Sequence, residues 1–255
     1  MTHNHRMNLA GLFDEAAATD PARPLLTYYD DTTGERTELS YLTFHNWVAK
    51  TANLLVDGLG FGAGDTAGVA LPAHWLTGPI LMGCWRAGLA VRHEPGSVEV
   101  LVTAEDAKTD GWSPGEHCAV SLTPMAVGLR DPRARRAAAD GELLDFLTEV
   151  RSHGDHFSPP TPVADTAPAL TALPGGGAAT QAGLVSAAHD RAAELGVQVG
   201  ERLLMTAERS RPLDWLLVPL AVKGSVVLCR NSQGVDLDRR ADTEHARRCQ
   251  SVRIG

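Results

Sequence analysis

The first part of the chain alternates between segments with a helical repeat and segments with a strand-like pattern. Apolar residues recur three and four positions apart over residues 8–18 and 40–57, which predicts two amphipathic helices. Asn8 and Ser40 stand at their starts and are typical N-caps. The same patterns predict strands at 24–30, 36–39 and 66–71, followed by a helix at 73–87.

The alternation continues to residue 248 and indicates the fold class. Strands are predicted at 89–91, 98–103, 117–122, 167–173, 202–206 and 225–229, and helices at 140–152, 184–195, 213–221 and 237–248. Strands that alternate with helices typically form βαβ units around a parallel sheet. We therefore expect an α/β fold with mostly parallel sheets and flanking helices.

One segment is typical of a linker between domains. Residues 154–166 contain three prolines and no apolar periodicity. We expect a first α/β subdomain over residues 1–153, this linker at 154–166, and a second α/β subdomain over residues 167–255.

Charge limits the classes of partner. The chain has 255 residues and a formal net charge of -8. Nucleic-acid binding needs clustered lysine and arginine side chains, so we expect no nucleic-acid partner. The local exception is a run of basic residues that is typical of an exposed loop leading into a helix: Arg130, Arg133, Arg135 and Arg136.

Cysteine spacing and hydropathy favour a cytoplasmic location. The four cysteines include no C-x-x-C pair, and Cys84 and Cys229 stand in apolar runs, which is typical of buried free thiols in a reducing compartment. The chain has no run of 18 apolar residues and no secretory signal at its start. We expect neither a membrane partner nor a metal site.

The strongest candidate site is the glycine-rich segment LPGGGAATQAG, from Leu173 to Gly183. A glycine-rich turn between a strand and a helix can direct backbone N–H groups at a phosphate. Phosphate loops usually add a lysine and hydroxyl side chains, whereas this segment has Thr180 as its hydroxyl and no basic residue before Ala188. Phosphate binding and a plain flexible turn therefore both stay open.

Other candidate motifs give weaker evidence for a functional site. The run from Gly58 to Ala63 matches a dinucleotide fingerprint, but it follows a helix and precedes a strand, the reverse of the required order. His74 is expected as a packing residue beside a tryptophan, and His189 with Asp190 is expected on the polar side of a helix. We assign no catalytic residue.

Several segments stand in an order and spacing that match a known family. They are 38–44 (ELSYLTF), 64–70 (GDTAGVA), 85–90 (WRAGLA), 200–204 (GERLL) and 219–228 (PLAVKGSVVL). Together they resemble the N-terminal part of the adenylate-forming superfamily, which includes acyl-CoA synthetases, luciferases and peptide-synthetase adenylation domains. The chain is also similar to a short actinobacterial family of unknown function that resembles a truncated, degenerate form of these enzymes.

The chain departs from the family pattern at positions that adenylation activity requires. The family's phosphate loop reads roughly [ST]-[SG]-G-[ST]-[ST]-G-x-P-K-G, and here Gly177 and Ala178 stand at hydroxyl positions and Ala182 at the lysine position. The loss of such donors typically costs about 10²–10³-fold in rate each. From the resemblance we expect no counterpart in this sequence of the family's later adenine-binding segment or its C-terminal domain. The resemblance leaves a vestigial nucleotide-phosphate loop of five residues: Gly175, Gly176, Gly177, Thr180 and Gly183.

Three functions remain open from the sequence. We expect a non-catalytic, adenylating-enzyme-like protein that acts in binding or regulation and needs no cofactor. The first alternative is a scaffold or oligomerisation module with a protein partner or a second copy of the chain. The second is a half-enzyme completed by a partner, with ATP or AMP as ligand and an ATP-dependent acid–thiol ligase-like activity.

Overall fold

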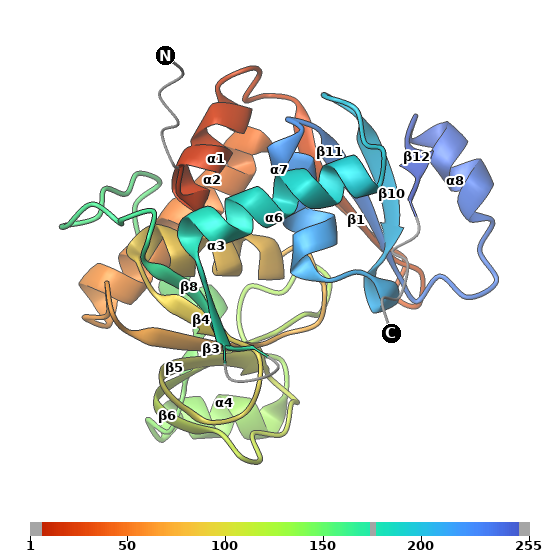
Figure 1. Ribbon diagram of the computed structural model, residues 1–255. Helices are drawn as coiled ribbons and strands as arrows, with labels where there is room; N and C mark the ends of the chain where they lie inside the picture. Colours follow the sequence, from red (N-terminus) through yellow and green to blue (C-terminus); the bar gives the residue numbers. More distant parts are fainter. Residues whose placement is uncertain (1–6, 174–176, 250–255) are drawn as a thin grey trace. The chain divides into compact units, whose positions relative to one another are not determined.

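The computed structural model describes residues 7–173 and 177–249, and the predicted α/β class is confirmed (Figure 1). The chain groups into two compact units that alternate along the sequence. Unit 1 comprises the described residues of Met1–His45, Pro72–Gly78 and Ala182–Gly255, and unit 2 comprises Asn46–Leu71 and Pro79–Gln181.

This division differs from the expected boundary at residues 154–166. The strand after the proline-rich segment, β8 (Pro168–Leu173), pairs in parallel with β4 (Ala90–Arg92), so it extends a sheet that the preceding residues have already built. Lys50 and Asn53 hold the segment itself, through bonds of 2.6 Å and 2.9 Å from their side-chain nitrogens to the carbonyl oxygens of His153 and Gly154. Prolines therefore mark an ordered connection within unit 2.

Unit 1 is built on a five-stranded sheet in the order β12–β10–β11–β1–β2, parallel except for the β1–β2 hairpin. Its strands are β1 (Pro24–Asp30), β2 (Glu35–Ser40), β10 (Arg202–Thr206), β11 (Ser225–Arg230) and β12 (Arg247–Arg248). β11 is buried along almost its whole length, as its apolar sequence predicts for a central parallel strand.

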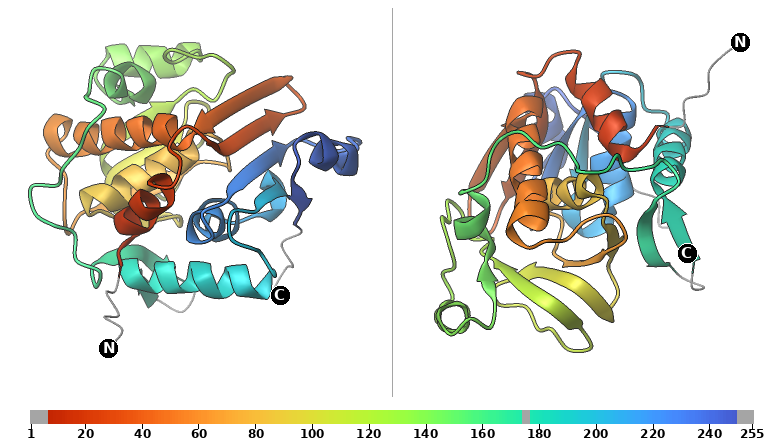
Figure 2. Two further views of the ribbon diagram at one scale, coloured as in Figure 1. Left: turned by 90° about the horizontal axis from the view of Figure 1, so that it is seen from above. Right: turned by 90° about the vertical axis from the view of Figure 1, so that its left-hand side faces the viewer.

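The helical elements of unit 1 cover this sheet (Figure 2). They are α1 (Leu9–Ala17), α6 (Gln181–Glu194, from its second residue), the turn η2 (Ala207–Arg209), the π-helical turn η3 (Leu213–Leu217), α7 (Val218–Ala221) and α8 (Leu237–Thr243). Asn8 caps α1 as predicted, because its side-chain oxygen accepts a 2.8 Å bond from the N–H of Gly11. α8 lies beside β12 and packs through Ala241 against Leu204 and Val227.

Unit 2 is built on a seven-stranded sheet in the order β7–β6–β5–β3–β4–β8–β9, parallel except for the β8–β9 pair. The strands not yet given are β3 (Thr66–Ala70), β5 (Ser97–Ala104), β6 (Ser113–Val120), β7 (Leu144–Asp145) and β9 (Gly177–Thr180). The helical elements are α2 (Tyr41–Asn53, the first five residues in unit 1), η1 (Leu54–Gly58), α3 (Thr77–Ala87, the first two residues in unit 1), α4 (Pro132–Ala139) and α5 (Phe146–Val150). In Figure 1, α3 and α4 lie on opposite sides of the strands.

Two predicted helices were wrong in their extent, and one strand of the unit 2 sheet was missed. The helix expected at 140–152 is a turn, a two-residue strand and the short α5, because Gly141 takes a left-handed conformation and Asp145 caps a new helix. The helix expected at 237–248 ends at Thr243, since the next residues turn back and Arg247 pairs with Leu203 of β10. The strand β9 was not predicted, because its alanines and glycine have little β-propensity.

Two sequence features have the expected structural outcome. All four cysteines are free and buried, Cys84 and Cys229 among them. Among the described residues, none of the helices combines the length and the apolar character that crossing a membrane requires.

Candidate functional site

The glycine-rich segment forms a hairpin rather than a turn that leads straight into a helix. β8 and β9 pair antiparallel, with Leu173 opposite Gly177, and α6 begins only at Gln181. Gly175 and Gly176 lie outside the described residues. Gly177 and Thr180 are exposed in β9, and Gly183 is exposed in the first turn of α6. The assignment of these five positions to nucleotide phosphate stays a prediction.

The histidines singled out in the sequence occupy structural positions. His74 is 1% exposed and its ring meets the ring of Tyr28 edge-on, with 4.6 Å between centroids. His189 and Asp190 are exposed on α6. Within residues 7–173 and 177–249, no three His, Cys, Asp or Glu side chains come together in a way that could hold a metal ion.

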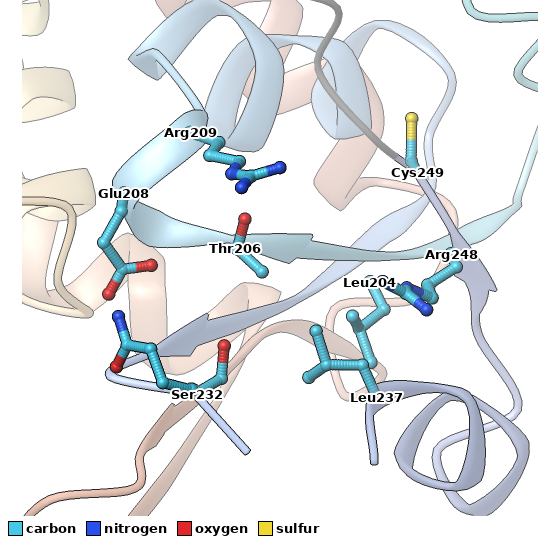
Figure 3. Close-up of a pocket in the computed structure, with 9 residues that line it drawn as sticks. Leu204, Thr206, Glu208, Arg209, Ser232, Leu237, Arg248 and Cys249 are labelled. Atoms are coloured by element: carbon cyan, nitrogen blue, oxygen red, sulfur yellow. The ribbon is translucent and has the colours of Figure 1, made fainter. Parts of the chain in front are cut away.

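A cavity of about 270 Å³ opens in unit 1 at the carboxyl ends of β10 and β11 (Figure 3). Open α/β sheets generally bind ligands at this edge, where the strands end and the loops begin. The cavity is lined by side chains from both strand ends, α8 and β12: Leu204, Thr206, Glu208, Arg209, Ser232, Gln233, Leu237, Arg248 and Cys249.

Local hydrogen bonds fix the loops around this cavity. Thr206 ends β10, and the turn η2 then presents Glu208 and Arg209. The Glu208 carboxylate accepts a 2.7 Å bond from the N–H of Asn231, which follows β11. Asn231 adopts a left-handed conformation and donates from its side chain to Asp30 at the end of β1, at 2.9 Å. Three neighbouring strand ends are thus joined before any ligand is present.

The carboxylate of Asp30 is held in its charged form. Burial raises the pKa of this group, but hydrogen bonds from Asn231 and from the N–H of Thr32 outweigh burial, so the pKa of Asp30 lies below its usual value. The Asp30 carboxylate, which accepts the hydrogen bond from Asn231 beside the cavity, therefore stays ionised near neutral pH.

The cavity is lined by two leucines and several polar side chains. Leu204 and Leu237 lie together, with Arg248 beside Leu204, while the Arg209 guanidinium and the Thr206 hydroxyl lie on the other side (Figure 3). Arg248 is engaged with Asp238 at 2.8 Å. In contrast, Arg209 makes no hydrogen bond or ion pair with the described part of the chain, although it stands at the mouth of the cavity.

The thiol in the cavity wall is not activated. Cys249 is 7% exposed, and burial raises the pKa of its thiol. A raised pKa keeps the sulfur protonated and weakly nucleophilic at neutral pH. The described lining contains no histidine or lysine that could serve as a general base. This arrangement can bind an anion through Arg209, and it places no histidine or lysine of the described lining beside the Cys249 thiol.

The fold defined by these sheets is that of the acyl-CoA synthetases. The crystal structure of Brucella canis acyl-CoA synthetase matches with a TM-score of 0.66 over 94% of this chain, at 15% sequence identity. The chain spans 45% of that synthetase, and at this identity the likeness shows the fold alone. The resemblance stated from the sequence segments is confirmed at this level.

The chain belongs to the TIGR03089 family of proteins. A TIGR03089 family protein from Mycobacterium tuberculosis is 34% identical over 241 residues, which cover 93% of this chain and 95% of that protein. No family model matches the chain. The predicted similarity to an actinobacterial family is confirmed by this relative.

Sequence reasoning missed the residues of the cavity, although part of the signal was present. Thr206 ends a predicted strand, and Ser232 closely follows the next one, so a parallel arrangement brings both to one edge. Nothing in the periodicity distinguishes Arg209 from the other arginines. The contribution of Cys249 depends on β12, which the predicted helix at 237–248 concealed.

Proposed function

We propose that this protein is a non-catalytic relative of the acyl-adenylating enzymes that binds a short carboxylic acid in the cavity beside β10 and β11, and acts in binding or regulation. The observation that carries this proposal is the Arg209 guanidinium, which has no partner in the described chain and stands across the cavity from Leu204 and Leu237.

The chemistry of the cavity selects the ligand class. A guanidinium binds a carboxylate through two parallel hydrogen bonds, and Thr206 can add a third donor. The two leucines favour an aliphatic tail. A volume of about 270 Å³ is at the lower limit of typical ligand cavities, about 300–1,000 Å³, and therefore suits a short acid. Brucella canis acyl-CoA synthetase is named for acyl groups, and a fatty acid is the simplest molecule with both features.

Two observations support a binding role without adenylation. Ala182, which stands where the family resemblance expects a lysine, lies in the first turn of α6 and brings no charge. The described lining of the cavity offers an unactivated thiol and no histidine or lysine. Adenylation needs cations at the transferring phosphoryl group, so we expect no ATP turnover.

A thermal-shift series tests the proposal. Straight-chain acids of two to ten carbons, the matching primary alcohols, ATP, AMP and CoA are each added to the wild-type chain, Arg209→Ala and Arg209→Lys. A short acid at about ten times its Kd should stabilise the wild-type protein by about 1.4 kcal/mol, which raises the Tm by about 3–5 °C. The alcohols should give no shift, and Arg209→Ala should lose the response to the acids.

Matched controls decide between a specific and a general effect. Arg239→Ala removes an exposed arginine of α8 from outside the cavity lining and should keep the response. A bound acid should also slow alkylation of Cys249, while the buried Cys84 provides the internal reference. An equal response in Arg209→Ala would refute the site, and release of pyrophosphate from ATP with a carboxylic acid would refute the non-catalytic role.

A further inference from the structure

A second surface with unpaired cations lies in unit 2, on the loop that leads into α4 and on α4 itself. Met125 and Val127 are 91% and 64% exposed, and Arg130, Arg133 and Arg135 are exposed beside them. We refer to these five residues as the 125–135 surface. Three of them, Val127, Arg130 and Arg135, line an open hollow of about 490 Å³.

The loop that carries the two apolar side chains is firmly held. The carboxylate of Glu105 accepts hydrogen bonds from the N–H groups of Arg130 and Asp131, at 2.6 Å and 2.8 Å. Asp145 accepts from the N–H of Leu129 at 2.9 Å. The Arg151 guanidinium donates to the carbonyl oxygen of Val127 at 3.0 Å. The exposure of the apolar side chains is therefore a fixed feature of the fold.

Met125 combines two unfavourable properties. Its φ angle is 56°, in the left-handed region that suits glycine and asparagine. Its large apolar side chain is also almost fully exposed. Neither property adds to the stability of the isolated chain, since a glycine would remove the strain and the exposed apolar area together. Met125 is therefore a candidate contact for a partner.

Three arginines of this surface have guanidinium groups that are not paired within the described part of the chain. Arg136 is paired with Asp140 at 3.7 Å, and Arg151 is used within the loop. In the described part of the chain, the guanidinium groups of Arg130, Arg133 and Arg135 make no hydrogen bond or ion pair. Ala134 packs inward against β6, so the arginines of α4 face solvent.

We propose that the 125–135 surface docks an acidic segment of a partner protein. Its carboxylates would pair with Arg130, Arg133 and Arg135, and one of its apolar side chains would pack on Met125 and Val127. Arginine and methionine are enriched at protein interfaces, whereas lysine is depleted, and this surface has no lysine. The guanidinium fork fits a carboxylate through two parallel hydrogen bonds.

Peptide selection with the full chain tests this proposal independently of the cavity in unit 1. A random twelve-residue display library is selected on the wild-type protein, with Met125→Gly and with Arg133→Glu as counter-targets. Selected peptides should be rich in Asp, Glu and one apolar residue, and their affinity for each variant should be about tenfold lower or more, as for an interface hot spot.

The variants separate a contact from a folding defect. Met125→Gly should keep or raise the Tm because it relieves backbone strain, and Arg133→Glu in the first turn of α4 is favoured by the helix dipole. Arg239→Glu on α8 is the matched charge control and should bind the peptides like the wild type. The proposal is overturned if no acidic consensus emerges, if both variants bind as well as the wild type, or if the protein binds heparin or phosphatidylglycerol vesicles and no peptide.

Discussion

His74 shows how one buried side chain couples folding to pH. Its Nδ1 accepts a 3.2 Å bond from the N–H of Leu76, so the neutral ring carries its proton on Nε2. Among the described residues that nitrogen has no hydrogen-bond partner, and it lies 3.9 Å from the carboxylate of Glu35. Burial lowers the pKa of His74, and the nearby Glu35 offsets this only in part.

The lowered pKa predicts a loss of stability as the pH falls. Below about pH 6.5, His74 is protonated in the unfolded chain but still neutral in the folded chain. The unfolded state therefore binds more protons, and the free energy of unfolding decreases as the pH falls. His74→Gln should remove this contribution and flatten the dependence between pH 7.5 and pH 5.5. Urea unfolding at three pH values measures the slope. His189→Gln, at an exposed histidine, should keep the wild-type slope, and a slope in His74→Gln equal to that of the wild type would contradict the assignment.

A buried ion pair sets a second residue-scale expectation. Arg191 of α6 and Asp214 of η3 are joined at 2.7 Å, with side chains 8% and 2% exposed. Asp214→Asn leaves a buried guanidinium without its main anion and should cost about 3 kcal/mol, because the desolvation of the remaining charge is no longer compensated. Urea unfolding measures the loss.

The matched control uses an exposed pair. Breaking the contact between Arg136 and Asp140, whose side chains are 86% and 57% exposed, should change the stability by less than about 0.5 kcal/mol. Replacing both Arg191 and Asp214 with leucine should be less harmful than the single variant. Equal losses for the buried and exposed pairs would show that the burial of Asp214 has no energetic consequence.

At the scale of elements, α8 is attached largely by polar contacts. Ala241 is its buried residue, and Leu237 is partly buried. The Glu244 carboxylate, just after the helix, accepts hydrogen bonds from the Tyr29 hydroxyl and, at 2.7 Å, from Arg202. Arg240 pairs with both carboxylate oxygens of Asp31, at 2.7 and 2.8 Å. α8 is therefore held against the sheet by charge more than by apolar area.

This attachment predicts a selective opening of α8. Glu244→Gln weakens charge-assisted bonds worth about 1–3 kcal/mol, so amide exchange in residues 237–243 should become roughly tenfold faster or more. Hydrogen exchange read by mass spectrometry should show no change in β11, which lies at the centre of the sheet. Unchanged exchange in α8 would mean that apolar packing suffices to hold it.

Most of the elements, but not all of their ends, follow from the sequence. The strands 24–30 and 202–206 have the predicted bounds because their apolar patterns and flanking turn residues agree. The failures lie where tertiary contacts decide: β9 exists through its pairing with β8, and β12 through its pairing with β10. A single-sequence pattern contains no information on such partners.

At the scale of the whole molecule, the family resemblance and the physical pattern agree on the α/β class, while the grouping of the units depends on long-range pairing. The proline-rich segment indicates a boundary only if the following strand starts a new sheet, and β8 instead joins β4. The cavity depends on the same kind of contact, because β10, β11, α8 and β12 must meet before its lining exists. Local periodicity predicts individual elements of this site but does not predict that they meet to form the cavity.

The parallel pairing of β1 with β11 has a consequence for synthesis on the ribosome. Leu26 of β1 lies opposite Val226 of β11. During synthesis, the edge of β1 that pairs with β11 therefore stays unpaired until β11 has left the ribosomal exit tunnel. Until then, the nascent β1–β2 hairpin offers its open edge to other chains. We therefore expect elongation speed and chaperone occupancy to influence the yield of this protein.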